Sequence, residues 1–186
     1  MARSLTAASS LLLLAALVGC PPEGSGTSTS RPADGIDVYF SPNGGCTAAV
    51  VRELDAAKQT IYVQAYSFTS APIAKALVDA HNRGVKVQAI LDKSQKTEKY
   101  SSADFVAHAG IPVQIDAAHA IAHNKVMVID GETVITGSFN FTKAAQDKNA
   151  ENLLVVRSKD LAAKYLENWQ LHAKHSEAYA GKQLGG

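Results

Sequence analysis

Five of the polar side chains in one short stretch, residues 123–140, together suit a phosphate group. The stretch reads HNKVMVIDGETVITGSFN. Lys125 can neutralise an anion, and the hydroxyl of Ser138 and the amide of Asn140 can donate hydrogen bonds to its oxygens. His123 can attack phosphorus or transfer a proton near neutral pH. The pattern therefore indicates a binding site for a phosphate ester, with Asp130 as its fifth polar residue.

Strand geometry predicts that four of these residues share a face. Residues two apart in a strand point to the same side, so His123 and Lys125 form one pair and Ser138 and Asn140 form another. The opposite side of the two strands should be apolar and belong to the core. It would consist of Val126, Val128, Ile135 and Phe139.

The turn between the two strands can be placed in two registers. Asp130-Gly131 is a strong hairpin signal, and a loop there would set His123 opposite Ser138. A loop at Gly131-Glu132 would set His123 opposite Asn140 instead. Both registers bring the polar side chains together at the open end of the hairpin. Asp130 itself would point away or lie in the turn, so we expect a structural role for it, with an electrostatic contribution to catalysis as the alternative.

The complete pattern His123-x-Lys125-x4-Asp130-x6-Gly137-Ser138-x-Asn140 resembles the HxKx4Dx6GSxN motif of the phospholipase D superfamily. The similarity extends over about residues 36–176, with VYFSPNGG, QAYSFTS and NAENLLVV in familiar places. Within the superfamily the chain resembles the small bacterial endonucleases that have one motif per chain. The resemblance implies a phosphohistidine mechanism without metal or cofactor, and an active site shared between two subunits.

The resemblance also singles out Glu151, in the segment NAENLL. It implies that this acidic residue holds the ring of His123, where a carboxylate could accept from Nδ1 and leave Nε2 free to attack. An exposed charge at the beginning of a strand is the alternative interpretation of Glu151.

The remaining histidines predict no metal site. His119 and His123 are four residues apart, as in the HExxH zinc motif, but Ala120 stands where the glutamate would be and strand-forming residues follow. His119 is expected to border the site or to be solvated. His172 and His175 fall in the last predicted helix, on a face expected to be solvated.

The elements around the motif predict an α/β domain. Strands are expected at 36–41, 60–66, 85–92, 111–116, on both sides of Asp130-Gly131 and at 152–158, and helices at 46–58, 70–84, 99–110 and 159–176. Strands that alternate with helices and then form a hairpin indicate a mixed sheet flanked by helices, as in the phospholipase D-like fold.

The beginning of the chain predicts export. Residues 1–20 combine a cationic start, an apolar run and the ending LVGC, which is typical of a lipoprotein signal with Cys20 as the lipidated residue; a plain cleaved signal is the alternative. Residues 21–35 should form a flexible linker, 36–178 the catalytic domain and 179–186 a loose tail. We therefore expect a membrane-anchored protein on the periplasmic side of a bacterial envelope.

The net charge of the chain bears on how a nucleic-acid substrate could be bound. Arg3 is the only charged side chain in residues 1–20, so the remainder carries 17 basic and 17 acidic side chains. A nucleic acid would have to be held by a local basic patch.

The leading expectation is a phosphodiesterase that cleaves DNA or RNA with little sequence specificity. A phospholipase D-type lipid hydrolase and a catalytically silent nucleic-acid-binding module are the alternatives. Because one imidazole cannot both attack and protonate the leaving group in line, a homodimer is expected.

Overall fold

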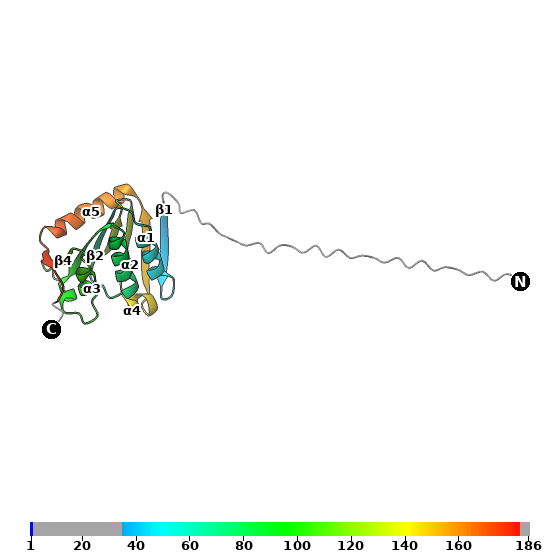
Figure 1. The fold of residues 1–186 in the computed structure, drawn as a ribbon, viewed down its shortest axis with the longest axis horizontal. Coiled ribbons are helices and arrows are strands. Elements are labelled where there is room, and N and C mark those ends of the chain that lie inside the picture. The colour runs from blue at the N-terminus through cyan, green and yellow to red at the C-terminus, as the bar shows by residue number, and fades with distance from the viewer. Residues whose placement is uncertain (2–34, 183–186) are drawn as a thin grey trace. The chain divides into compact units, whose positions relative to one another are not determined.

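The computed structural model describes Met1 and residues 35–182, and the latter form one mixed sheet with helices on both faces (Figure 1). The strands are β1 Gly35–Ser41, β2 Thr60–Ala65, β3 Lys86–Asp92, β4 Val113–Asp116, β5 Lys125–Ile129, β6 Thr133–Gly137, β7 Glu151–Arg157 and β8 Glu177–Tyr179. The helices are α1 Cys46–Ala56, α2 Ala71–Asn82, α3 Ala103–His108, α4 Lys143–Asp147 and α5 Lys159–Ala173, with a 3-10 turn η1 at Lys93–Lys96.

The eight strands lie in the order β1-β7-β6-β5-β2-β3-β4-β8. Strands β2, β3 and β4 run parallel and are joined by helical crossovers, whereas β5, β6, β7 and β1 pair antiparallel in turn, and β8 pairs antiparallel with β4. The expected mixed sheet flanked by helices is confirmed.

Three short elements were not predicted from the sequence: η1, α4 and β8. Each is too short for a clear periodic pattern. Strand β8 crosses the domain boundary expected at residue 178, and the first part of the expected loose tail is held in place. The hydroxyl of Tyr179 and the backbone N–H of Lys182 both donate to Asp104, at 2.6 and 2.9 Å. The leader expected over 1–20 and nearly all of the linker over 21–35 lie outside the described residues.

The two faces of the sheet have separate cores. Helices α1, α2 and α3 cover one face and share a large apolar core with Met127, Ile129 and Ile135. Helix α5 covers the other face, where Ala162 packs against Val128 (Figure 1). It is anchored by the buried Trp169, whose indole N–H donates to the carbonyl oxygen of Val63 in β2 at 2.9 Å.

Lys125 and Glu151 lie along one edge of the sheet, formed by strand ends, which we call the polar edge. Because of the strand directions, the ends of β1, β2, β3, β4 and β6 meet the beginnings of β5, β7 and β8 along this edge. Lys125 lies beside Ala65, and Glu151 lies beside Ser41. The sheet therefore places the beginning of β5, the end of β6 and the beginning of β7 next to one another, although they are separated in sequence.

The β5–β6 hairpin adopts neither of the two expected registers. Asp130 and Gly131 form the centre of the turn, both with positive φ (54° and 65°), and the N–H of Glu132 donates to the carbonyl oxygen of Ile129 at 3.0 Å. Glu132 is then an extra residue before β6, so that Met127 pairs with Ile135. This register lies between the two that the turn signal suggested.

The register corrects the expected core face. Val126 and Val128 pack on the side of α5, whereas Ile135 and Phe139 pack on the side of α1 to α3. The expectation that these four residues share one face was therefore wrong. His123, Ser138 and Asn140 lie beyond the ends of β5 and β6, so their positions depend on the connecting segments rather than on strand alternation.

A buried ion-pair group lies far from this edge, at the end of β7. Arg157 donates to Asp37 of β1 at 2.9 Å and to Glu53 of α1 at 3.2 Å. The side chain of Arg157 is 7% exposed and that of Glu53 is fully buried. The group joins α1, β1 and β7. Removal of Arg157 should be costly because the buried carboxylate of Glu53 then loses the cation that is buried with it.

We expect Arg157→Met to lower the free energy of unfolding by about 3 to 5 kcal/mol. Chemical denaturation followed by circular dichroism measures the change. Arg52→Met is the matched control, because Arg52 also lies near Glu53, at 3.9 Å, but its side chain is 53% exposed. That control should change stability by less than about 1 kcal/mol. Equal effects of the two substitutions would contradict the assignment.

Candidate active site

His123 lies at the end of the segment 117–124, which joins β4 to β5 along the polar edge. Two hydrogen bonds hold this segment: the N–H of Ala122 donates to the buried carboxylate of Asp92 at 2.8 Å, and the N–H of Tyr66 donates to the carbonyl oxygen of Asn124 at 2.8 Å. The backbone on both sides of His123 is therefore fixed, while its side chain is exposed. An exposed imidazole on a fixed backbone is suited to meet a substrate.

Asp92, which accepts the bond from Ala122, is stabilised in its charged form. Burial alone would raise the pKa of its carboxyl group, but hydrogen bonds from Ser94 and from the N–H of Ala122 outweigh burial and lower the pKa from the usual 3.8. The carboxylate is thus stabilised in its charged form and can keep holding the 117–124 segment.

Tyr66 links the histidine to the lysine of the motif. Its ring lies 4.6 Å from the ring of His123, centroid to centroid, and the ammonium nitrogen of Lys125 lies 5.2 Å from the centre of the same ring. Lys125 also donates to the carbonyl oxygen of His123 at 2.9 Å. Tyr66 therefore packs beside both motif residues.

Lys125 is the buried cation of the site, at 8% exposed. Burial lowers its pKa below the usual 10.5, and the negative charge of Glu151 acts in the opposite direction. A half-desolvated ammonium group attracts an anion more strongly than one in water. Lys125 is therefore placed to meet the phosphate oxygens.

The glycine and serine of the motif lie where β6 passes β7. A β-carbon on Gly137 would lie 2.3 Å from the carbonyl oxygen of Asn152, and φ is +140° there, so glycine is required. The N–H groups of Ser138 and Phe139 both donate to that same oxygen, which forms a β-bulge. The hydroxyl oxygen of Ser138 accepts from the N–H of Asn152 at 3.0 Å, which orients it and leaves its hydrogen available to donate.

Asn140 follows the bulge and is half-buried. Among residues 35–182, its side-chain oxygen is buried and has no hydrogen-bond partner. Buried polar atoms nearly always have a partner, so this oxygen is suited to accept a hydrogen bond from a donor outside the chain, such as a water.

Glu151 begins β7 and acts on Lys125 through its charge. Its carboxylate accepts from the side-chain amide of Asn149 at 3.3 Å. Within the described part of the chain, no hydrogen bond joins Glu151 to His123. The orienting role that the resemblance implies for Glu151 stays a prediction.

Asp130 lies at the opposite end of β5 from Lys125. The five residues of β5 rise about 3.3 Å each, so the two are roughly 16 Å apart. The Asp130 carboxylate accepts three backbone N–H groups, from Lys58, Gln59 and Thr60, at 2.8 to 2.9 Å. These bonds join the hairpin turn to the beginning of β2, which is a structural role.

Three histidines that the sequence left solvated or at the border of the site gather further along the same edge. His119 lies near His172 and His175, and all three surround the buried carboxylate of Asp116. The sequence signal was present as two pairs three residues apart, Asp116-x-x-His119 and His172-x-x-His175, but 52 residues separate the pairs and nothing in the sequence joined them.

Comparison with known proteins places the chain in a family. Residues 50–171 match the family model described as "Cardiolipin synthase, PLD-like domain". The chain therefore belongs to the phospholipase D-like family. It is 46% identical over 134 residues to a protein of Rickettsia conorii named phospholipase D, which covers 72% of this chain and 67% of the relative.

Solved structures share the fold. Nuc from Salmonella typhimurium, described as a phospholipase D family member, is 41% identical, with a TM-score of 0.76 over 78% of this chain and 97% of that chain. NucT from Helicobacter pylori is 24% identical and has a TM-score of 0.71 over 78% of this chain and 99% of that chain.

A further relative by sequence, a mouse protein named mitochondrial cardiolipin hydrolase, is 28% identical over 152 residues, which is 82% of this chain and 65% of the relative.

We expect Asp130→Asn to lower stability and to leave catalysis almost unchanged. An amide retains one acceptor oxygen but loses the charge that strengthens three backbone hydrogen bonds, which should cost about 1 to 3 kcal/mol. Asparagine tolerates the positive φ of this position. Denaturation measures the stability, and turnover of a small soluble phosphodiester measures catalysis. A folded variant that has lost 100-fold or more in turnover, about the effect of losing a catalytic group, would instead show a catalytic role for Asp130.

Proposed function

We propose that the protein is a phosphodiesterase that cleaves DNA or RNA, with little sequence preference, through a covalent phosphohistidine. The observation that carries the proposal is the exposed imidazole of His123 on a fixed backbone, next to the buried ammonium group of Lys125. A nucleophile beside a fixed positive charge and a free hydroxyl donor, that of Ser138, is the combination that attack on a phosphodiester needs.

The reaction has two displacements. In the first, Nε2 of His123 forms a bond to phosphorus, the bond from phosphorus to the leaving oxygen breaks, and a second histidine gives that oxygen a proton. In the second, the same second histidine removes a proton from water, the water oxygen bonds to phosphorus, and the bond to His123 breaks. Lys125 and Ser138 stabilise the charge on the non-bridging oxygens in both steps.

The protein's own cation and donors supply this stabilisation, so we infer that cleavage needs no metal ion. Asp130 is occupied by backbone N–H groups, and Glu151 interacts with Lys125 and Asn149. Neither carboxylate is thereby placed to share a divalent ion with the phosphate.

A basic and aromatic segment beside the site favours nucleic acid as the substrate. Lys93, Lys96 and Lys99 follow the end of β3 at the polar edge, and Tyr100 beside them is 71% exposed. The ammonium group of Lys93 donates to the carbonyl oxygen of His119, on the segment that carries His123. Lysines that follow a phosphate backbone and an exposed ring on which a base can stack are typical of single-strand binding.

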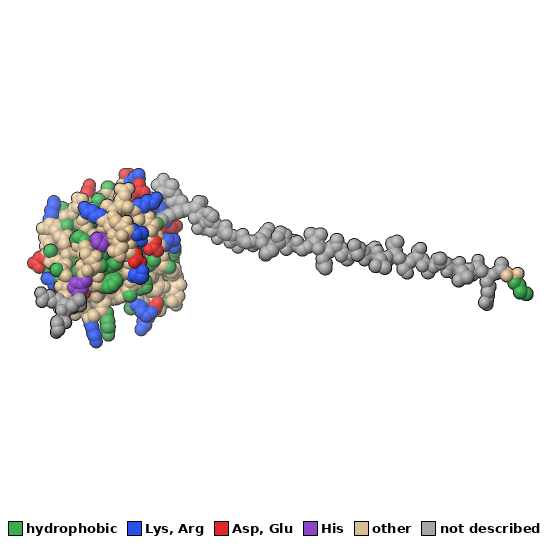
Figure 2. Space-filling model, in the orientation of Figure 1, with side chains coloured by type: hydrophobic (Ala, Val, Ile, Leu, Met, Phe, Trp, Pro, Cys, Tyr) green, Lys and Arg blue, Asp and Glu red, His purple; other side chains and the backbone are tan. Residues whose placement is uncertain are grey.

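Residues 93–100 provide the local basic patch that a chain of nearly balanced charge needs to bind a nucleic acid. On the visible face of the domain, basic and acidic side chains are interspersed rather than separated into one field (Figure 2). The segment is held against the site because the amide oxygen of Gln95 accepts from the N–H of Phe68 at 3.2 Å and from the hydroxyl of Ser101 at 3.1 Å.

Membrane phospholipid is the second candidate substrate. Ile121, two residues before His123, is 54% exposed and would meet an acyl chain or a bilayer surface. Relatives named phospholipase D and mitochondrial cardiolipin hydrolase point the same way. The chemistry at phosphorus is identical for both substrates, so only the groups around the site can separate them.

The substrates are separated by two variants on one panel of single-stranded DNA, RNA and phospholipid vesicles, each in excess EDTA. We expect cleavage of nucleic acid, and Tyr100→Ala should lower it about tenfold because a stacked base is lost. Ile121→Ser should have little effect on nucleic acid cleavage. His123→Ala should abolish cleavage. If the protein hydrolyses only the vesicles, and Ile121→Ser lowers this activity whereas Tyr100→Ala does not, the result would support phospholipid as the substrate instead. Activity that requires added metal would refute the mechanism.

We further propose that a homodimer supplies the second histidine. Strand β1 is an edge strand, and Ile36, Val38 and Phe40 on one of its faces are 64%, 49% and 64% exposed. They lie on the same side as α5, which packs mainly over β2, β4, β5 and β6 and so does not reach them. This apolar strip ends near Glu151, at the polar edge, so a partner seated there would lie beside the active site.

Mixed dimers test the shared site. A heterodimer of wild-type and His123→Ala subunits should lose activity by about 100-fold or more, because either attack or proton donation is missing. Retention of half the activity would show that each chain has its own complete site. Phe40→Asp should give an inactive monomer in analytical ultracentrifugation, whereas Phe105→Asp, at an exposed phenylalanine on α3, should stay dimeric and active. A fully active Phe40→Asp monomer would contradict the proposal.

The leader expected over residues 1–20 is the basis for a proposed location of the protein in the cell. No helix among the described residues combines the length and the apolar character that crossing a membrane requires. We propose attachment through a lipid on Cys20, with the domain on the periplasmic side of the envelope. Cys20→Ser should move the protein out of the membrane fraction or stall its maturation. A wild-type protein recovered wholly in the soluble periplasmic fraction would contradict lipid attachment.

A further inference from the structure

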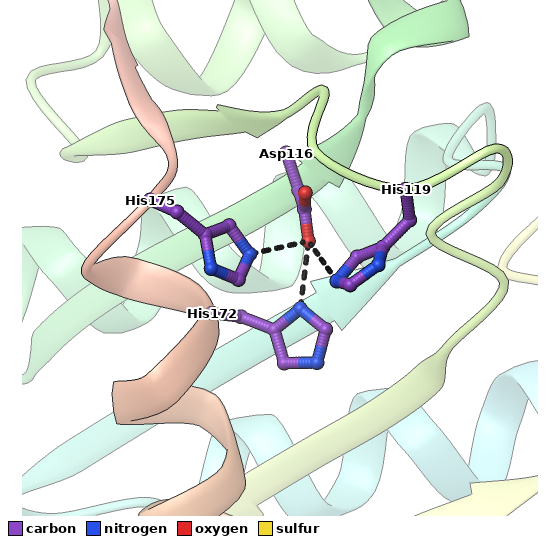
Figure 3. A group of neighbouring side chains, drawn as sticks. All are labelled: Asp116, His119, His172 and His175. Carbon is purple, nitrogen blue, oxygen red and sulfur yellow. Dashed lines mark hydrogen bonds and ion pairs between the residues drawn. The ribbon is translucent and has the colours of Figure 1, made fainter.

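Three imidazole rings surround one carboxylate oxygen at the polar edge of the sheet (Figure 3). Asp116 ends β4, His119 lies in the 117–124 segment, and His172 and His175 lie in and just after the last turn of α5. The ring centroids are 5.0, 5.3 and 5.3 Å apart, which is close to an equilateral triangle. One donor atom from each of the four residues can be chosen so that all lie within 4.8 Å of one another.

The three imidazole rings lie at different distances from the carboxylate oxygen. The Oδ2 atom of Asp116 lies 2.6 Å from Nδ1 of His172, but 3.3 Å from Nε2 of His175 and 3.7 Å from Nε2 of His119. The first is a short hydrogen bond, the second is a long one, and the third is beyond hydrogen-bond range. A tetrahedral zinc ion with bonds of 2.0 to 2.1 Å holds its ligand atoms about 3.3 to 3.5 Å apart, so the two longer distances bracket that spacing.

A backbone hydrogen bond orients the carboxylate of Asp116 toward the three rings. Oδ1 of Asp116 accepts the N–H of Ala118 at 3.1 Å, so Oδ2 faces the three rings. The side chain of Asp116 is fully buried, while those of His172, His175 and His119 are 16%, 38% and 46% exposed. One side of the group therefore remains open to solvent, and an ion can enter from there.

We propose that Asp116, His119, His172 and His175 form a binding site for one zinc ion. Three imidazole nitrogens and one carboxylate oxygen are ligands that zinc accepts in tetrahedral sites. With four protein ligands the site is closed, which is typical of a structural ion rather than a catalytic one. The ion lies apart from the phosphodiesterase site: β4 is three strands from β5, roughly 14 Å.

The ion would join two parts of the chain that are distant in sequence. It would connect the end of β4, the 117–124 segment and the end of α5. His123 lies on the same segment as His119, four residues further on. Bound zinc therefore stabilises the segment that carries the proposed nucleophile, without taking part in its chemistry.

Zinc binding to the full chain, purified without a histidine tag and freed of metal with EDTA, tests the proposal. Titration with zinc chloride should show one ion per chain at this site and raise the melting temperature by about 5 to 10 °C at saturation. His175→Ala should weaken that binding roughly 100-fold or more, since loss of a residue that merely orients a ligand already costs 10- to 100-fold. His108→Ala, at an exposed histidine at the end of α3, is the matched control and should bind as the wild type does.

The location is tested without any variant by anomalous diffraction at the zinc edge from wild-type crystals soaked in zinc chloride. A peak between the four side chains is expected. His119→Ala serves as the second variant if His175→Ala does not fold. No zinc bound by the wild type, a peak elsewhere only, or equal binding by His175→Ala and His108→Ala would overturn the proposal and leave the group as a carboxylate–imidazole network. Cleavage activity that survives EDTA while the melting temperature falls separates this site from the phosphodiesterase mechanism.

Discussion

The connection from β4 to β5 has to run along one edge of the sheet, because β4 ends and β5 begins at that edge. Two other strands, β2 and β3, lie between them, so the eight residues 117–124 pass over both strand ends. Hydrogen bonds from the backbone to Asp92 and from Tyr66 fix the path. The position of His123 depends on this constraint, since β5 itself begins only at Lys125.

Lys125 combines burial and charge. Lys125 is buried against Tyr66 and the carbonyl oxygen of His123, and burial makes its charged form less stable than in water. Glu151 offsets part of that penalty across the neighbouring strands. A phosphate would provide the remaining opposite charge at close range, so the same burial that destabilises the free lysine strengthens its attraction to an anion.

The same edge carries two groups with different chemistry. Near β5 the groups are a free imidazole, an ammonium and neutral donors, which suit an anion. Near β4 the groups are a buried carboxylate and three converging imidazoles, which suit a cation. The strands between them keep the two apart, and residues 117–124 contribute a histidine to each.

The sequence by itself determined the element types and the composition of the motif. Periodicity located all the elements except the short η1, α4 and β8, because a period of two or of 3.6 is a local property of each longer segment. It also identified the residues expected to carry the chemistry, since His123, Lys125, Ser138 and Asn140 occur at the spacing of a known motif. The tertiary structure decided the register of the hairpin, where Glu132 adds one residue that the turn signal at Asp130-Gly131 does not encode.

Only the tertiary structure brought together the groups that are distant in the chain. Tyr66 contacts His123 because β2 pairs with β5, and Asp116 meets His172 because α5 crosses back over the sheet. Sequence patterns describe neighbours within a strand or a helix. Contacts between segments some 50 residues apart depend on strand order and on the direction of each connection, which no local period contains.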